Sequence, residues 1–367
     1  MSQPPIQLTV ETNPRSRYDA IDVDSLIRSS HGNILDHYSR VLYCSHHTTA
    51  GYLDQRLATW LLHRREGLDP FIQRIQRRFP RGAGYRHDDM RFRSELTHEQ
   101  RLNEPPNGDA HLTFIGSGLQ NCVTYHHRPG VPVFLMDLDG THNGVPRTRT
   151  SSVVAFTSER KVAELDLEVP VSRRAIDSVN LYDPRLGLRQ RIEELLAGHP
   201  ITCGRLDIAV PKGEDGAAVT VNEYETLLMR HDLADVLRDP VRFVARQGRR
   251  MLRDPRAVPA KSLGYARYDV VQVVNRLLDL LGPSGDLLEG AVARLMAIPA
   301  ARRLRFKQSL SLAVGDGGGH GSTVVRGRYQ TPILIQWRAT PRRHRSLRLT
   351  LSPVSYTHLR AHETADV

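Results

Sequence analysis

Long apolar runs, cysteines and aromatic residues are all scarce in this chain of 367 residues. The longest apolar runs, such as 131–136 and 277–281, are far shorter than the roughly 18 residues that a membrane-spanning helix needs. The opening residues hold neither a basic nor an apolar segment, so we expect no export signal. Three cysteines are an odd and sparse set that fits a reducing compartment. The sequence therefore predicts a cytoplasmic protein without a membrane segment.

The overall composition is that of a folded globular protein, with 40% hydrophobic and 25% charged residues. The length suits two domains that each bury a core. The net charge of +11 is concentrated in arginine-rich stretches at 238–256 and 302–348, and such clusters can bind nucleic acid. Only 6% of the residues are aromatic, however, and no nucleic-acid motif is present. Contact with nucleic acid is therefore not favoured.

Strand and helix patterns alternate along both halves, which predicts two α+β domains. A strand pair is expected at 206–210 and 217–221, and helices are expected near 223–237, 240–252, 269–281 and 286–297. The final residues resemble translated sequencing-adapter DNA and are treated as non-native. The expected divisions are a lead with one short strand at 1–17, a first domain at 18–170, a bridging helix segment at 171–205, a second domain at 206–354, and a tail at 355–367.

Three histidines lie in unusual surroundings. His111 interrupts an apolar stretch that follows a Pro-Pro-Asn-Gly turn, while His47 and His87 lie in short polar motifs upstream. Three neutral imidazoles that converge with an open position can hold a catalytic divalent metal such as zinc. Alternatively, each histidine is an isolated polar residue that is satisfied locally. A histidine cluster that holds a metal is therefore one of two interpretations, and three separate, locally satisfied histidines are the other.

An anion site is the other functional interpretation of the same residues. Protonated histidines beside Arg147 and Arg149, with the hydroxyl groups of Thr48 and Thr49, could bind phosphate or pyrophosphate. The residues alone do not separate a metal site from an oxyanion site.

These motifs together resemble the YjbQ-like family, also called secondary thiamine-phosphate synthases. The resemblance runs from about residue 18 to about residue 169. It is carried, in order, by His47-Thr48-Thr49-Ala50-Gly51, Tyr85-x-His87-Asp88, Asn107-x-x-Ala110-His111-Leu112, Asp139-Gly140 and Arg147-x-Arg149.

The resemblance implies a compact α+β fold that assembles as a homo-oligomer, a trimer, with the histidine cluster near subunit boundaries. It also implies a transferase that joins two phosphorylated small molecules, with Zn or Mg or an oxyanion at the cluster. The implied catalytic and metal-binding residues are His47, His87 and His111, and the implied substrate-binding residues are Thr48, Asn107, Arg147 and Arg149.

The sequence departs from the family pattern in two places. Gln55-Arg56 stands where the family has Asn-Glu, and Gly130-Val131-Pro132-Val133 stands where it has Gly-Thr-Trp-Gln. The first change removes a carboxylate that could bind a metal or act as a general base.

The second half offers a faint parallel to these motifs. Ala218-Val219-Thr220-Val221-Asn222-Glu223, followed by Gly264-Tyr265-Ala266-Arg267-Tyr268-Asp269, is similar to the first two motifs without their histidines. This suggests a degenerate copy of the first domain that supplies Glu223. A competing hypothesis is a non-catalytic YjbQ-like binding protein whose basic second half binds nucleic acid or an acidic partner.

Overall fold

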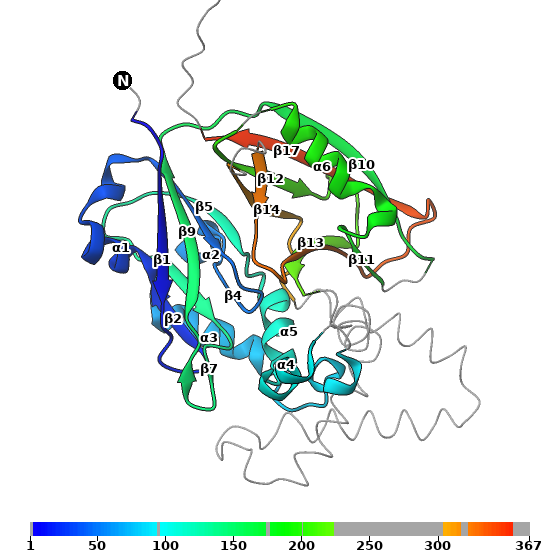
Figure 1. The fold of residues 1–367 in the computed structure, drawn as a ribbon, viewed down its shortest axis with the longest axis horizontal. Helices are drawn as coiled ribbons and strands as arrows, with labels where there is room; N and C mark the ends of the chain where they lie inside the picture. The colour runs from blue at the N-terminus through cyan, green and yellow to red at the C-terminus, as the bar shows by residue number, and fades with distance from the viewer. Residues whose placement is uncertain are drawn as a thin grey trace, which may run out of the picture.

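The computed structural model of this protein describes residues 3–93, 96–173, 177–199, 201–223, 304–316 and 322–354. The fold is α+β, as expected, with two sheet-rich halves (Figure 1). No helix in the described ranges is both long and apolar enough to cross a membrane. The helices expected between 223 and 297, and the tail at 355–367, lie outside the described residues.

The first half contains a four-stranded antiparallel sheet and a smaller sheet. The large sheet has the order β1 (Ile6–Thr12), β9 (Arg149–Phe156), β3 (Arg40–Ser45) and β5 (Cys122–His126). The small sheet has the order β2 (Asp19–Asp22), β6 (Phe134–Asp137) and β4 (Ala50–Gly51), and β7 (Thr141–His142) pairs with β8 (Val145–Pro146). The N-terminal lead therefore contributes an edge strand to the large sheet.

The helices of the first half include one that is buried along its whole length. This helix is α5 (Gly108–Ser117), whose ten residues are all buried, as the apolar composition of this stretch indicated. The other helices are α1 (Val23–His31), α2 (Gln55–Trp60), α3 (Arg65–Gln76) and α4 (His98–Asn103), with short 3₁₀ turns at Ile34–His37, Arg86–Asp88 and Met90–Phe92. α3 begins at Arg65 and contains Pro70.

The second half is built from two further sheets. Its large sheet has the order β10 (Ala163–Pro170), β17 (His344–Pro353), β12 (Cys203–Ala209), β14 (Ser309–Asp316) and β15 (Ser322–Val325). Its small sheet has the order β11 (Asp177–Asn180), β16 (Thr331–Gln336) and β13 (Ala217–Asn222). A 3₁₀ turn at Pro184–Leu186 precedes α6 (Leu188–Ala197).

Three expectations about this region differ from the structure. β12 and β13 do not pair with each other, because β12 lies between β14 and β17 and β13 pairs with β16. The segment expected to bridge two domains contains α6, which buries Leu188, Ile192 and Leu196 in the core of the second half. β10, placed at the end of the first domain, pairs along its length with β17, so the second half begins before residue 170.

The two halves repeat one topology. The large sheet of the first half has the order β1-β9-β3-β5, which corresponds to the order β10-β17-β12-β14 in the second half. The small sheets correspond in the same way, with β2-β6-β4 in the first half and β11-β16-β13 in the second. The register agrees as well, because Asp19 and Ala50 both lie opposite Asp137, as Asp177 and Ala217 both lie opposite Gln336. The strand order thus supports the interpretation of the second half as a degenerate copy.

A buried arginine occupies the same place in each half. Arg149 on β9 donates to the carboxylate of Asp137 and to the carbonyl of Asp139. Arg345 on β17 donates to the side chain of Gln336 and to the carbonyl of Arg338, two residues later. The side-chain bond that joins the large and small sheets is therefore retained in both copies.

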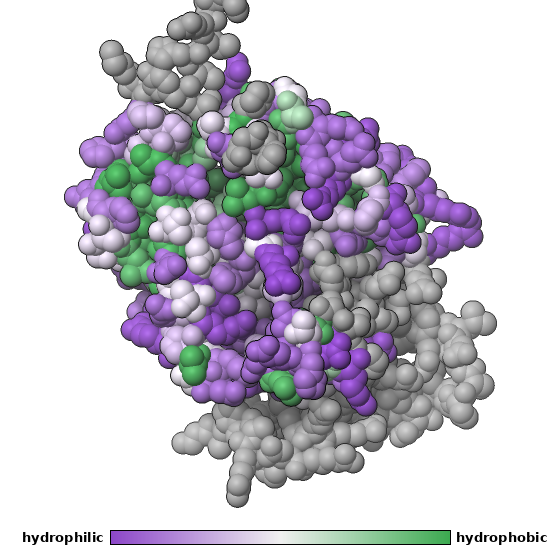
Figure 2. Space-filling view, viewed as in Figure 1, coloured by the Kyte–Doolittle hydropathy of each residue, from purple (hydrophilic) through white to green (hydrophobic). Residues whose placement is uncertain are grey.

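The halves share one hydrophobic core. Ile333 and Ile335 of β16 belong to the same cluster of buried residues as Ile72 of α3 and Phe114 of α5. Figure 2 shows hydrophobic residues gathered in the upper part of this view, over the two large sheets, while the lower part is mostly hydrophilic. Because apolar burial is the main favourable term in folding, this shared core holds the facing surfaces of the halves together.

We expect Asp137→Ala to destabilise the protein by about 3–5 kcal/mol, because it leaves the buried Arg149 guanidinium without its carboxylate. Urea unfolding measures this change. Asp166→Ala is the matched control, since Asp166 pairs with Arg348 at the surface, and we expect little effect from it. Equal losses for the two variants would contradict the structural role of the Asp137–Arg149 pair.

Candidate functional site

His111 reaches the junction of the two halves from the middle of α5. Its side chain is only 1% exposed. The helix begins at Gly108, where a Cβ atom would lie 2.9 Å from Cβ of Tyr85, so glycine avoids a steric clash at this position. His111 Nδ1 lies 2.7 Å from Oδ1 of Asn222 in the second half.

His87 faces His111 from the 3₁₀ turn at Arg86–Asp88. The ring is fully buried, and the centroids of the two imidazoles are 4.7 Å apart. His87 Nδ1 lies 3.2 Å from Oδ1 of Asp88, which also accepts a hydrogen bond from the backbone N–H of Gly108 at 2.8 Å. Asp88 therefore fixes the ring of His87 to the first turn of α5.

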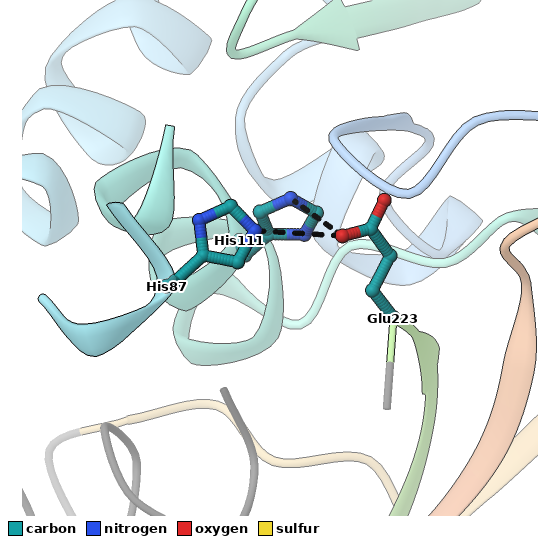
Figure 3. Close-up of side chains that lie close together, drawn as sticks. All are labelled: His87, His111 and Glu223. Carbon is teal, nitrogen blue, oxygen red and sulfur yellow. Dashed lines mark hydrogen bonds and ion pairs between the residues drawn. The ribbon is translucent and has the colours of Figure 1, made fainter. Parts of the chain in front are cut away.

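Glu223 enters the same space from the second half, directly after β13. Its Oε2 atom lies 3.4 Å from Nε2 of His87 and 3.7 Å from Nε2 of His111 (Figure 3). Tetrahedral zinc with bonds of 2.0–2.1 Å separates its ligand atoms by about 3.4 Å. Within the described part of the chain, His87, His111 and Glu223 form a group of potential metal ligands that could share one ion.

Asn222 determines which nitrogen of His111 carries the proton. Its amide nitrogen donates to the carbonyl of Thr48, so its Oδ1 atom is the acceptor that faces His111. His111 Nδ1 must then be the donor, and Nε2 keeps its lone pair toward Glu223. Hydrogen bonds of this kind orient histidine ligands at metal sites.

The three ionisable groups have strongly shifted pKa values. Burial lowers the pKa of His111 to about 4 despite the nearby charge of Glu223. Burial also opposes charge on His87, but hydrogen bonds to Asp88 and Glu223 outweigh it and raise the pKa to about 9. Burial opposes charge on Glu223 too, yet His111 and His87 hold its pKa at about 2. The metal-free site thus contains a charged His87, a neutral His111 and a carboxylate.

A buried arginine and a second carboxyl group border these residues. Arg93 is 2% exposed, and its guanidinium lies 3.2 Å from Nε2 of His87 and 3.7 Å from Oε2 of Glu223. Glu104 is half-buried, and its pKa is raised by burial and by the negative charge of Glu223. The site therefore has a fixed cation beside it and a carboxyl group that retains its proton more readily than usual.

The structure brings together two of the three histidines expected in the cluster. His47 does not belong to this group, because its Nε2 atom accepts a hydrogen bond from the backbone N–H of Thr150. Burial and the charge of Arg149 lower the pKa of His47 to about 3. Thr48 contacts the site through its backbone carbonyl, which accepts from Asn222, and not through its hydroxyl group.

The other expected site residues surround Asp139. Asn107 donates to its carboxylate at 2.7 Å, and Arg147 is paired with the same group. Arg147 is about one-third exposed, whereas Arg149 is buried against Asp137. The two arginines are thus engaged by carboxylates in this structure, Arg149 more completely than Arg147.

The residues that sequence reasoning left out of the cluster are Arg93 and Asn222, and Glu223 entered it only through the faint repeat. Arg93 lies in a charged stretch that looks like a solvated loop. Asn222 ends β13 and Glu223 follows it, and their match to the Asn-Glu pair of the family was the available signal. That pair is absent at Gln55-Arg56 and present here instead.

Comparisons with known proteins find similar solved structures, but no protein-family model or curated protein matches the chain. A YbjQ-like protein of unknown function from Sulfolobus solfataricus is 17% identical, with 53% of this chain and 99% of that chain covered and a TM-score of 0.28. A hypothetical protein from Aeropyrum pernix is 19% identical, with 52% and 98% covered and a TM-score of 0.28.

A third neighbour is an uncharacterised protein of the yjbq/upf0047 family from Clostridium acetobutylicum. It is 12% identical, with 51% of this chain and 98% of that chain covered and a TM-score of 0.24. The Sulfolobus and Clostridium neighbours thus carry YbjQ-like or yjbq/upf0047 names, and their matches cover about half of this chain.

The shifted pKa values predict how stability depends on pH in the metal-free protein. The contribution of His87 is complete below pH 6.5 and is lost as the pH rises through 9. The contribution of Glu223 to the unfolding free energy is present above pH 4.5 and is lost as the pH falls toward 2. The contribution of the neutral His111 ring is present above pH 6.5 and is lost as the pH falls to 4. We therefore expect the unfolding free energy to decline between pH 7 and pH 9.

Urea unfolding at pH 7 and pH 9 tests this expectation in a His87→Gln variant, in which most of that decline should disappear. His31→Gln, at an exposed position on α1, is the control and should retain the decline of the wild type. An identical decline in His87→Gln would mean that His87 is not charged in the folded protein at neutral pH.

Proposed function

We propose that the protein is a metal-dependent enzyme that acts on a phosphorylated small molecule at the junction of its two halves. The observation that carries this proposal is the convergence of two imidazole nitrogens and one carboxylate oxygen in a buried site. Two histidines and a glutamate form one of the ligand sets of catalytic zinc, and such sites leave a position open for water or substrate.

The donor atoms favour zinc or a similar transition metal over magnesium. Magnesium prefers oxygen ligands and retains several waters, whereas imidazole nitrogen suits zinc and iron. The Nε2 atom of His111 already has its lone pair available, and His87 must lose the proton that it shares with Glu223. When bound, the metal would place positive charge against a phosphate oxygen of the substrate.

The surroundings of the site support an anionic substrate. Arg93 presents a guanidinium beside the three ligands, and this group matches the geometry of phosphate oxygens. Arg147 is partly exposed and could exchange its contact with Asp139 for a phosphate group. Glu104, whose pKa is raised by burial and by the charge of Glu223, is the candidate for proton transfer at the site.

The finer proposal is the reaction that the family resemblance implies. In this reaction a pyrimidine pyrophosphate joins a thiazole phosphate, and pyrophosphate leaves. Arg93 and the metal would neutralise the departing pyrophosphate, while the packing of the two halves around the site would exclude bulk water. The carboxylate missing at Arg56 is no obstacle to this proposal, because Glu223 presents one to both histidines.

Ion pairs neutralise several arginines in the described part of the second half, while the arginine-rich stretch at 238–256 lies outside the described residues. Arg345 pairs with Glu214, Arg348 with Asp166, and Arg205 with both Glu159 and Asp207. Because non-specific nucleic-acid binding depends on free cationic groups that release counterions, these pairs reduce the charge available for it.

We expect the protein to bind one Co²⁺ or Zn²⁺ ion per chain at this site. Isothermal titration and cobalt absorbance should show that Glu223→Gln weakens binding by at least ~10–100-fold, because the carboxylate ligand is lost. Glu164→Gln, at a surface ion pair with Lys161, is the control and should bind like the wild type. Affinity should rise with pH up to about 9, as His87 loses its proton more easily.

We expect thiamine phosphate to form from the two phosphorylated precursors when the metal is present. His111→Ala should abolish product formation, while His31→Ala should leave it unchanged, and chromatography of the product measures both. Metal binding without product from the wild type would retain the metal site and reject this particular reaction.

A further inference from the structure

The two copies of the fold differ at the residues that matter for the site. Ala50 and Ala217 occupy equivalent register positions, opposite Asp137 and Gln336. Arg56 follows Ala50 by six residues (56 − 50), and Glu223 follows Ala217 by six residues (223 − 217). Glu223 is 7% exposed between the histidines of the other half, whereas Arg56 is exposed. One copy thus retains a site carboxylate at a position where the other has a cation.

The two halves meet through the outer faces of their large sheets. In the first half, this face presents Leu42, Cys44, Cys122, Val154 and Phe156, which form a cluster with Ala313 and Val354 of the second half. Arg205 of β12, which lies opposite Ala313 of β14, donates to the hydroxyl of Thr124 on β5. The end of β13 adds a further contact, because Asn222 donates to the carbonyl of Thr48.

The contacting sheet face of the second half is more polar than its counterpart in the first half. Val154 lies five residues after the buried Arg149 and pairs with Leu42. Thr350 lies five residues after the equivalent Arg345 and pairs with Asp207. Phe156, two residues further on, is matched by Ser352. The two copies therefore differ in the character of the faces through which they meet.

We propose that the second half is an internal copy of the first that serves as its built-in neighbour and completes one functional site within each chain. Asn222 and Glu223 supply the groups that Gln55 and Arg56 no longer supply. Asn222 is a positioning residue, since it acts through the proton on His111, and Glu223 is the group that contacts the metal. Among the described residues, no reciprocal group of metal ligands forms beside Arg56. The metal readouts below depend on the function proposed above.

Mixing of variants tests whether the site forms within one chain or between copies. Glu223→Gln retains both histidines and His111→Ala retains the carboxylate, so a site formed between copies would reappear when the two proteins are mixed. For a site within one chain, we expect the mixture to bind no more Co²⁺ than the variants do separately, at every concentration. Recovery of Co²⁺ binding in the mixture would overturn the proposal.

A swap variant tests the loss of the reciprocal site. Arg56→Glu alone should leave Co²⁺ stoichiometry at one per chain, and Arg56→Glu in the Glu223→Gln background should not restore binding. Arg56→Lys is the matched control for the substitution itself. Two Co²⁺ ions per chain in Arg56→Glu, or restored binding in the double variant, would show that the first copy retains a usable site.

A measurement without metal separates failure of this inference from failure of the proposed function. In protein with ¹⁵N-labelled histidine, NMR should show the His111 proton on Nδ1, and Asn222→Leu should shift the ring toward a mixture of tautomers. Addition of excess unlabelled wild-type protein to labelled Asn222→Leu should not restore the original signal. If wild-type protein binds no metal but shows this behaviour, the internal copy stands and the metal function falls. If the signal of the wild type changes on dilution, or unlabelled protein restores it, the site lies between copies.

Discussion

The carboxylate of Glu223, held between two imidazoles, is the interaction on which the centre of this structure depends. A charged group that is 7% exposed is costly unless other groups compensate for it, and here the compensation comes from His87, His111 and Arg93. All three lie in the first half of the chain, whereas Glu223 lies in the second. Any separation of the halves would leave a charge unpaired on both sides, so the site and the arrangement of the halves stabilise each other.

The shape of the site is set by groups that do not contact its centre. Asp88 joins His87 to the N-terminal turn of α5, and Asn222 connects His111 to the backbone at Thr48. Each imidazole is held through Nδ1, so both Nε2 atoms face Glu223. A constellation fixed in this way needs little rearrangement to bind a metal, which lowers the entropic cost of binding.

Duplication explains why a chain with Arg56 can still have a carboxylate at its site. Two copies of a fold can change independently when each supplies different parts of one site. The first copy has retained the histidines, and the second has retained Asn222 and Glu223 on a scaffold whose buried arginine, Arg345, matches Arg149. The sheet faces have diverged as well, because Asp207 and Thr350 stand where the first copy has Leu42 and Val154.

The sequence by itself determined the α+β class, the apolar burial of α5, and two members of the site, His87 and His111, because these follow from local composition and short motifs. It also suggested the repeat and Glu223, though only through a short match in the second half.

Tertiary structure decided the rest. His47 was expected in the cluster but binds the backbone of Thr150, and Arg93 was hidden in a charged stretch, since neither hydrogen-bond partners nor burial can be read from neighbouring residues. β12 and β13 were expected to pair, yet each finds its partner more than a hundred residues away in the chain, because strand order depends on contacts that local patterns do not encode. The register of two complete halves, rather than any motif, placed Glu223 beside the histidines.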